Sequence, residues 1–145
     1  MTLYYDKDGK PIGLMRWARL FEDLRYRVVG QSHFENLTVS TVWLGFDMDV
    51  FNQALPREKQ MPPLMFESMV FEVPQGDDVW HSLEQRRYRT LREAKVGHAE
   101  LCHVITTMMD IKEEVMSDAG VRDLPDLSTY QEDPPDLTVD GEGQA

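Results

Sequence analysis

Three carboxylates in the middle of the chain have a spacing that could bind a divalent cation. Asp47, Asp49 and Glu58 stand at positions 1, 3 and 12 of the calcium loop of an EF-hand, where oxygen ligands are required. The rest of that template fails, because Phe51 occupies position 5 and Asn52 occupies position 6, where the sharp turn needs glycine. We therefore expect a solvated acidic loop here and no metal site.

A histidine and the single cysteine of the chain could begin a zinc or iron site. His98 and Cys102 are four residues apart, so they share one face of a predicted helix. No HExxH or Cys-x-x-Cys motif supplies further ligands, and a thiol inside a helix lacks the N-terminal dipole that lowers its pKa for nucleophilic attack. We predict that Cys102 is a small apolar residue and that His98 is a core or interface histidine hydrogen-bonded to the sheet.

Carboxylates on neighbouring segments could also form an acid–base pair. Asp47, Glu67 and Glu72 lie on or beside predicted strands. Together with His98, Asp47 and Glu67 define one alternative function, a ligand-binding protein or hydrolase-like enzyme with its pocket beside the loop 47–63. The chain has no nucleophile elbow, P-loop or dinucleotide-binding motif. The sequence therefore favours a protein without catalytic residues and without a cofactor.

One short segment is strongly basic and contains an aromatic residue. Its members are Arg86, Arg87, Tyr88, Arg89 and Arg92. Arginines beside an aromatic ring can hold a phosphate or a stacked base. Since the field of an acidic protein repels polyanions, we favour pairing of these arginines with Glu84, Glu93 or the acidic C-terminal segment.

Composition narrows the class of protein. The 145 residues include 26 acids and 15 bases, a formal net charge of -11, which disfavours direct binding to nucleic acid or to an anionic membrane. No apolar run reaches the ~18 residues of a membrane span, and the first residues carry charges where a signal peptide is apolar. A single cysteine allows no internal disulfide. We expect one intracellular domain.

Most of the negative charge lies at the C-terminus. Residues 118–145 hold eight acids and one base, a net charge of -7, whereas residues 1–117 carry only -4. The segment contains three prolines and few large apolar residues, so it cannot offset the entropy of ordering. The prediction is a single domain over 1–117 followed by a disordered acidic tail over 118–145.

Hydrophobic periodicity predicts an α+β fold for the domain. The expected elements are a turn at Asp8-Gly9, a helix from Leu14 to Asp23, a hairpin of segments 25–34 and 37–46, a loop over 47–63, a strand over 63–73, a helical turn with a short extended segment over 79–90, and a helix over 91–116 that begins with a Thr90–Glu93 capping box. They assemble into a small antiparallel sheet of three to four strands, packed by a short N-terminal helix and a long C-terminal helix.

The long predicted helix raises the question of oligomerisation. At 1.5 Å per residue it would be ~39 Å long, longer than the sheet that it covers. Its distal end could project from the domain, pair with another chain, or fold back on the helix from Leu14 to Asp23. The sequence leaves these arrangements open.

Five segments taken together resemble a known group of proteins. YYDKDGKPI, MRWARLFED, STVWLGFDMD, PPLMFESMVFEV and RYRTLREAKVGH are similar to segments of a family of small, functionally uncharacterised proteins encoded mainly by tailed bacteriophages and prophages. The resemblance covers residues 3–104. It implies a phage origin and a location in the host cytoplasm, and it brings no established activity. This chain reads Gly45-Phe46-Asp47-Met48 where the family usually has a histidine, which weakens an enzymatic interpretation.

These observations favour an interaction protein over an enzyme. We expect the domain to present Trp43, Trp80 and segment 86–92, or the long helix and its acidic tail, to a host or phage protein, including one with a basic surface. Occupation of a nucleic-acid-binding surface as a mimic, or interference with a host defence complex, would suit the tail. A minor component of the virion is the third possibility.

Overall fold

The structure is a computed structural model of the chain and describes residues 3–74, 76 and 80–119. Two compact units divide the chain, residues 1–110 and residues 111–145. All sheets and most helices belong to the first unit, and the following description concerns that unit unless stated otherwise. The acidic tail predicted from residue 118 lies outside the described residues from residue 120 onward.

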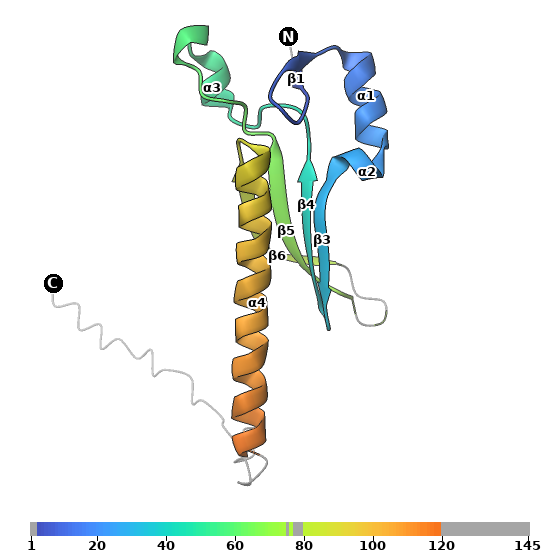
Figure 1. Cartoon of the computed structure of the whole chain (residues 1–145), viewed down its shortest axis with the longest axis vertical. Helices are drawn as coiled ribbons and strands as arrows, with labels where there is room; N and C mark the ends of the chain where they lie inside the picture. Colours follow the sequence, from blue (N-terminus) through green and yellow to red (C-terminus); the bar gives the residue numbers. More distant parts are fainter. Residues whose placement is uncertain (1–2, 75, 77–79, 120–145) are drawn as a thin grey trace, which may run out of the picture. The chain divides into compact units, whose positions relative to one another are not determined.

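A four-stranded antiparallel sheet forms the centre of the first unit (Figure 1). Its strands are β3 (Val28–Phe34), β4 (Leu37–Trp43), β5 (Phe66–Glu72) and β6 (His81–Tyr88). The spatial order β3-β4-β5-β6 is the order along the chain. The predicted hairpin is confirmed, with Glu35 at its turn in a left-handed conformation (φ 35°).

The helices and the small N-terminal hairpin complete the α+β fold that the sequence predicts. They are β1 (Tyr4–Tyr5), β2 (Pro11–Ile12), α1 (Leu14–Glu22), α2 (Leu24–Arg27), α3 (Val50–Ala54), the 3-10 helix η1 (Arg57–Lys59) and α4 (Leu91–Ala119). Gly9 has φ +80° and supplies the turn between β1 and β2. The short N-terminal helix and the long C-terminal helix are thus both confirmed.

One face of the sheet carries the core, because side chains alternate between the two faces of a strand. Val39, Thr41 and Trp43 of β4 point to the same side as Phe66, Ser68 and Val70 of β5, and all six are buried. The N-terminal part of α4 lies over this face. Its residues Ala94, Leu101 and Ile105 pack against the strands in two apolar clusters.

The opposite face of the sheet has no comparable apolar cluster among the described residues. Of the β4 residues on that side, Thr38 is buried and Ser40 and Val42 are half-buried. We refer to the two sides as the helix face and the outer face. Each residue of a strand belongs to one or the other.

Several local predictions differ from the structure. Residues 25–27, expected to begin the hairpin, belong to helix α2. Residues 81–88 form one complete edge strand, where a helical turn was expected before a short extended segment. In the capping box, the Glu93 backbone N–H donates to Thr90 Oγ1 at 3.2 Å as predicted, but the Glu93 carboxylate accepts from the backbone N–H of Arg89. In a standard capping box the Glu93 carboxylate would accept from the backbone N–H of Thr90. Here it accepts from the residue before Thr90.

Candidate functional site

His98 lies between α4 and the sheet in a network of hydroxyl groups. Its Nδ1 is 2.7 Å from Thr41 Oγ1, and its Nε2 is 3.0 Å from Ser32 Oγ. Thr41 Oγ1 is also 2.5 Å from Ser68 Oγ. The prediction of an interface histidine hydrogen-bonded to the sheet is confirmed.

The ring of His98 fits because the facing strand has a glycine. A side-chain carbon on Gly30 would lie about 3.0 Å from two ring atoms of His98. Thr41 and Ser68 are completely buried, so no substrate reaches their hydroxyls without movement of α4. The pairing of hydroxyls with an imidazole therefore holds the helix on the sheet and does not form an accessible nucleophile–base pair.

Burial lowers the pKa of His98, and this makes a prediction about stability and pH. The unfolded chain then takes up a proton more readily than the folded chain. The contribution of His98 to stability is complete above the unfolded pKa of about 6.5 and is lost as the pH falls through the lowered folded value. In urea unfolding between about pH 8 and pH 5, His98→Gln should reduce the loss of stability on acidification relative to wild type.

The test has a built-in comparison. His103 lies on the same helix and is exposed, so His103→Gln is the matched substitution outside the buried network. Equal profiles for wild type and His98→Gln would show that the buried imidazole does not control the response.

A second polar network fixes the loop between β4 and β5. Asp47 Oδ1 accepts hydrogen bonds from the backbone N–H groups of Asp49 (3.0 Å) and Leu64 (2.9 Å), and its Oδ2 accepts from the Asn52 amide (2.9 Å). Asn52 is buried and also bonds both backbone polar groups of Met61, at 2.9 and 2.8 Å. One carboxylate and one amide thus tie both ends of the loop together.

Arg89 connects this loop to the end of β6. Its guanidinium donates to Asp49 Oδ2 at 2.5 Å and to the carbonyl of Pro62 at 2.7 Å. Asp49 Oδ1 caps α3 by accepting from the backbone N–H of Asn52. The hydrogen bond from Arg89 is the main cause that holds the pKa of Asp49 below its usual range.

The network engages the carboxylates that the calcium-loop template would use as ligands. The oxygens of Asp47 and Asp49 are occupied by protein donors, and Glu58 lies on the exposed helix η1. Within the described ranges, no group of three or more His, Cys, Asp or Glu residues is arranged to hold a metal ion. Asp47 is a structural residue of the loop.

The rigid loop displays apolar side chains to solvent. We define the loop patch as Val50, Phe51, Leu55 and Met61, all of which are exposed. At 85% exposure, Phe51 is the most exposed large apolar residue in the part of the chain that the structure describes. These apolar side chains are therefore available to solvent while the loop beneath them is held by hydrogen bonds.

The residues of the alternative enzyme site do not converge. Glu67 pairs across the sheet with Val42 and Arg87 on the outer face, whereas His98 lies against the helix face. Glu67 forms an ion pair with Arg87 at 3.1 Å and accepts from Gln85 at 2.7 Å. Because alternate residues of a strand point in opposite directions, Glu67 and His98 cannot act on one ligand.

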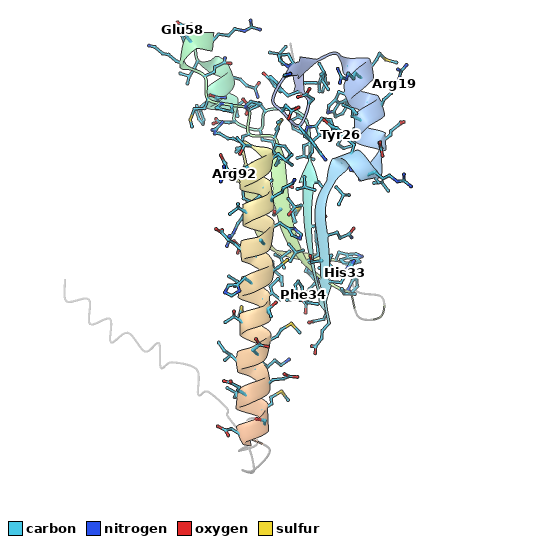
Figure 2. The ribbon with its side chains drawn as sticks, in the orientation of Figure 1. Arg19, Tyr26, His33, Phe34, Glu58 and Arg92 are labelled. Carbon is cyan, nitrogen blue, oxygen red and sulfur yellow. The ribbon has the colours of Figure 1, made fainter. Side chains whose placement is uncertain are left out.

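The basic cluster is divided among three environments. Arg86 lies on the helix face and pairs with Glu84 (3.2 Å) and Glu100 (3.7 Å), Arg87 pairs with Glu67 on the outer face, and Arg89 belongs to the loop network. Pairing of these arginines with the domain's own carboxylates is therefore seen. Tyr88 packs against Gly97 of α4, and Arg92 is exposed at the start of that helix (Figure 2).

The two tryptophans predicted to face a partner differ sharply. Trp43 is completely buried in the core, where it meets the edge of Tyr26, so it offers no surface to a partner. This corrects the expectation that the domain presents it. Trp80 is 54% exposed and contacts Phe71 edge-to-face at a centroid distance of 6.1 Å.

The loop patch was not anticipated from the sequence. Apolar residues between polar and proline residues carry no periodic signal. In the sequence, Phe51 is notable only because it breaks the calcium-loop template at position 5. Asn52 and Asp49 were the available clue, since Asp is a preferred helix cap and Asn often bonds nearby backbone.

Comparison with protein-family models, with curated protein sequences and with solved structures finds no match to this chain. In residues 3–74, 76 and 80–119, no helix combines the length and the apolar composition needed to cross a bilayer.

Proposed function

We propose that this chain is a non-enzymatic interaction protein that binds a protein of a bacterial host or of the phage itself through the loop patch. The observation that carries the proposal is the 85% exposure of Phe51 on a loop whose polar groups are already satisfied. The outer-face residues and Trp80 are further surface, but they lack this combination of rigidity and apolar exposure.

Rigidity matters because ordering a loop on binding reduces affinity. The bonds from Asp47, Asn52 and Arg89 fix the loop before any partner arrives. A partner that covers the loop patch then gains apolar burial, about 1.5–3 kcal/mol for each large side chain that becomes fully buried. Phe51 has the size and position of an interface anchor.

The sequence-based hypothesis of binding to a basic partner depended on the acidic tail. Residues 120–145 lie outside the described residues, so the tail remains a separate proposal. The loop patch belongs to the domain itself. Truncation of the tail and substitution in the loop patch can therefore be compared directly.

Replacement of Phe51 should strongly weaken partner capture without affecting stability. Because the side chain is exposed, Phe51→Asp should leave the melting temperature nearly unchanged, whereas loss of an interface anchor weakens binding by about 2 kcal/mol, or about thirtyfold. The measurement is capture from a bacterial host lysate with the full chain as bait, followed by titration of the purified partner.

Site-specific cross-linking identifies which surface is bound. A photoreactive phenylalanine derivative at position 51 should give a covalent adduct with the captured protein. The same group at Val96, an exposed position on α4, serves as the matched control. Capture that survives Phe51→Asp, or adducts only from position 96, would remove the loop patch from the function.

A further inference from the structure

A different surface of the domain combines basic and apolar residues, and it is independent of the loop patch. The α1–α2 surface consists of the exposed residues Leu14, Met15, Arg16, Arg19, Leu24 and Arg25. Figure 2 shows Arg19 on the side of α1 that faces away from the sheet. Residues 3–27 hold six bases against four acids, a net charge of +2 in a chain of net charge -11.

The arginines of this surface differ from those of β6. Arg86, Arg87 and Arg89 pair with carboxylates, whereas Arg16, Arg19 and Arg25 form no ion pair with any residue that the structure describes. Two of the four acids in residues 3–27 are engaged elsewhere, whereas the exposed Asp8 and Glu22 form no ion pair with any described residue. Asp6 closes the β1–β2 turn, and Asp23 caps α2 by accepting from the Arg25 backbone N–H.

Helix α1, which carries Arg16 and Arg19, is anchored by its aromatic residues. Trp17 stacks between Tyr4 and Phe21 at centroid distances of 4.6 and 5.0 Å, and its indole N–H donates to the carbonyl of Leu44 at 2.9 Å. The aromatic side of α1 is thus used for packing. Leu14 and Met15 are left exposed near the arginines, at 56% and 70%.

We propose that the α1–α2 surface binds an acidic segment of another protein, in which apolar side chains alternate with carboxylates. Carboxylates pair with the three arginines, and the apolar side chains cover Leu14, Met15 and Leu24. Charge complementarity supports this occupant, because the three arginines have no ion-pair partner among the described residues and segment 3–27 has a net charge of +2.

A short segment fits better than a long polyanion or a membrane. At physiological ionic strength charges are screened beyond about 8 Å, so a short peptide responds mainly to the local arginines. Nucleic acid or an anionic bilayer extends over a wider area and meets the repulsion of the acidic protein as a whole. Helix α1 has nine residues and is therefore about 14 Å long, which matches a short extended peptide.

The experiment measures fluorescence anisotropy of a labelled peptide with alternating aspartate and leucine, titrated with the full chain. The test variant combines Arg16→Glu, Arg19→Glu and Arg25→Glu. The matched control combines Arg57→Glu, Lys59→Glu and Arg92→Glu, which changes the net charge equally at exposed positions elsewhere. Melting curves establish that both variants fold, and a milder set with glutamine replaces the test variant if it does not.

We expect the test variant to bind the peptide about tenfold more weakly than wild type, since three exposed ion pairs each contribute a factor of about two. The control should bind like wild type. Equal weakening in both variants, or no weakening in either, overturns the proposal. Stronger arginine-dependent binding to phosphatidylglycerol vesicles or to a single-stranded oligonucleotide would assign the surface to that ligand instead. The loop patch plays no part in these outcomes.

Discussion

Trp43→Ala is expected to lower the free energy of unfolding by about 3–5 kcal/mol, the loss typical of a large aromatic side chain removed from a core. Trp43 has no exposed surface, and its ring meets Tyr26 edge-on at 5.0 Å. The cavity would open between the sheet and the helices that cover it. Urea unfolding followed by circular dichroism measures the change.

Trp43→Phe is the matched control for this experiment. The indole N–H of Trp43 has no hydrogen-bond partner among the described residues, so phenylalanine removes volume without breaking a hydrogen bond. We expect a loss of about 1–2 kcal/mol. An alanine variant as stable as wild type would contradict the position of Trp43 in the core and would restore the hypothesis that it faces a partner.

Asp47→Ala should release the loop and impair both stability and binding. The carboxylate accepts three hydrogen bonds, two from backbone groups and one from the buried Asn52. At about 1 kcal/mol for each bond, the loss of stability is about 3 kcal/mol. Partner binding through Phe51 should weaken as well, because a mobile loop must be ordered on association.

Glu58→Ala provides the comparison within the same loop. This carboxylate is exposed on η1, so its removal should change stability by less than about 0.5 kcal/mol. Unfolding in urea measures stability, and titration of the captured partner measures binding. Equal stability for Asp47→Ala and Glu58→Ala would show that the loop network does not hold the loop.

The fold could be predicted where burial imposes a period on the sequence. Strand β4 contributes Val39 and Trp43 to the core, and helix α4 contributes Leu101 and Ile105, so these residues recur at the spacings of a strand and a helix. Strand β6 lies at the edge of the sheet and is mostly exposed. Its charged residues carry no such period, so its extent could not be predicted.

The candidate site was harder to predict because the role of a side chain depends on which way it points from its strand or helix. His98 was placed correctly, since a histidine on the apolar side of a helix needs partners. Glu67 and Asp47 lie on or beside neighbouring segments, which suggested a shared site with His98. Glu67 points to the opposite face of the sheet from His98, and the carboxylate oxygens of Asp47 accept hydrogen bonds from the loop itself. The exposure of Phe51 depends on bonds between Asn52 and Met61 that no short-range pattern reveals.

The order of the strands bears on how the chain reaches its folded state. Each strand pairs with the next one along the chain, so forming the sheet closes only the loops between successive strands. Closing such loops costs little conformational entropy. The hairpin of β3 and β4, joined at Glu35 and Asn36, has the shortest connection and is suited to nucleate the sheet. The hydrogen bond between His98 and Ser32 joins residues 66 positions apart, so docking of α4 is expected to be the late step that completes folding.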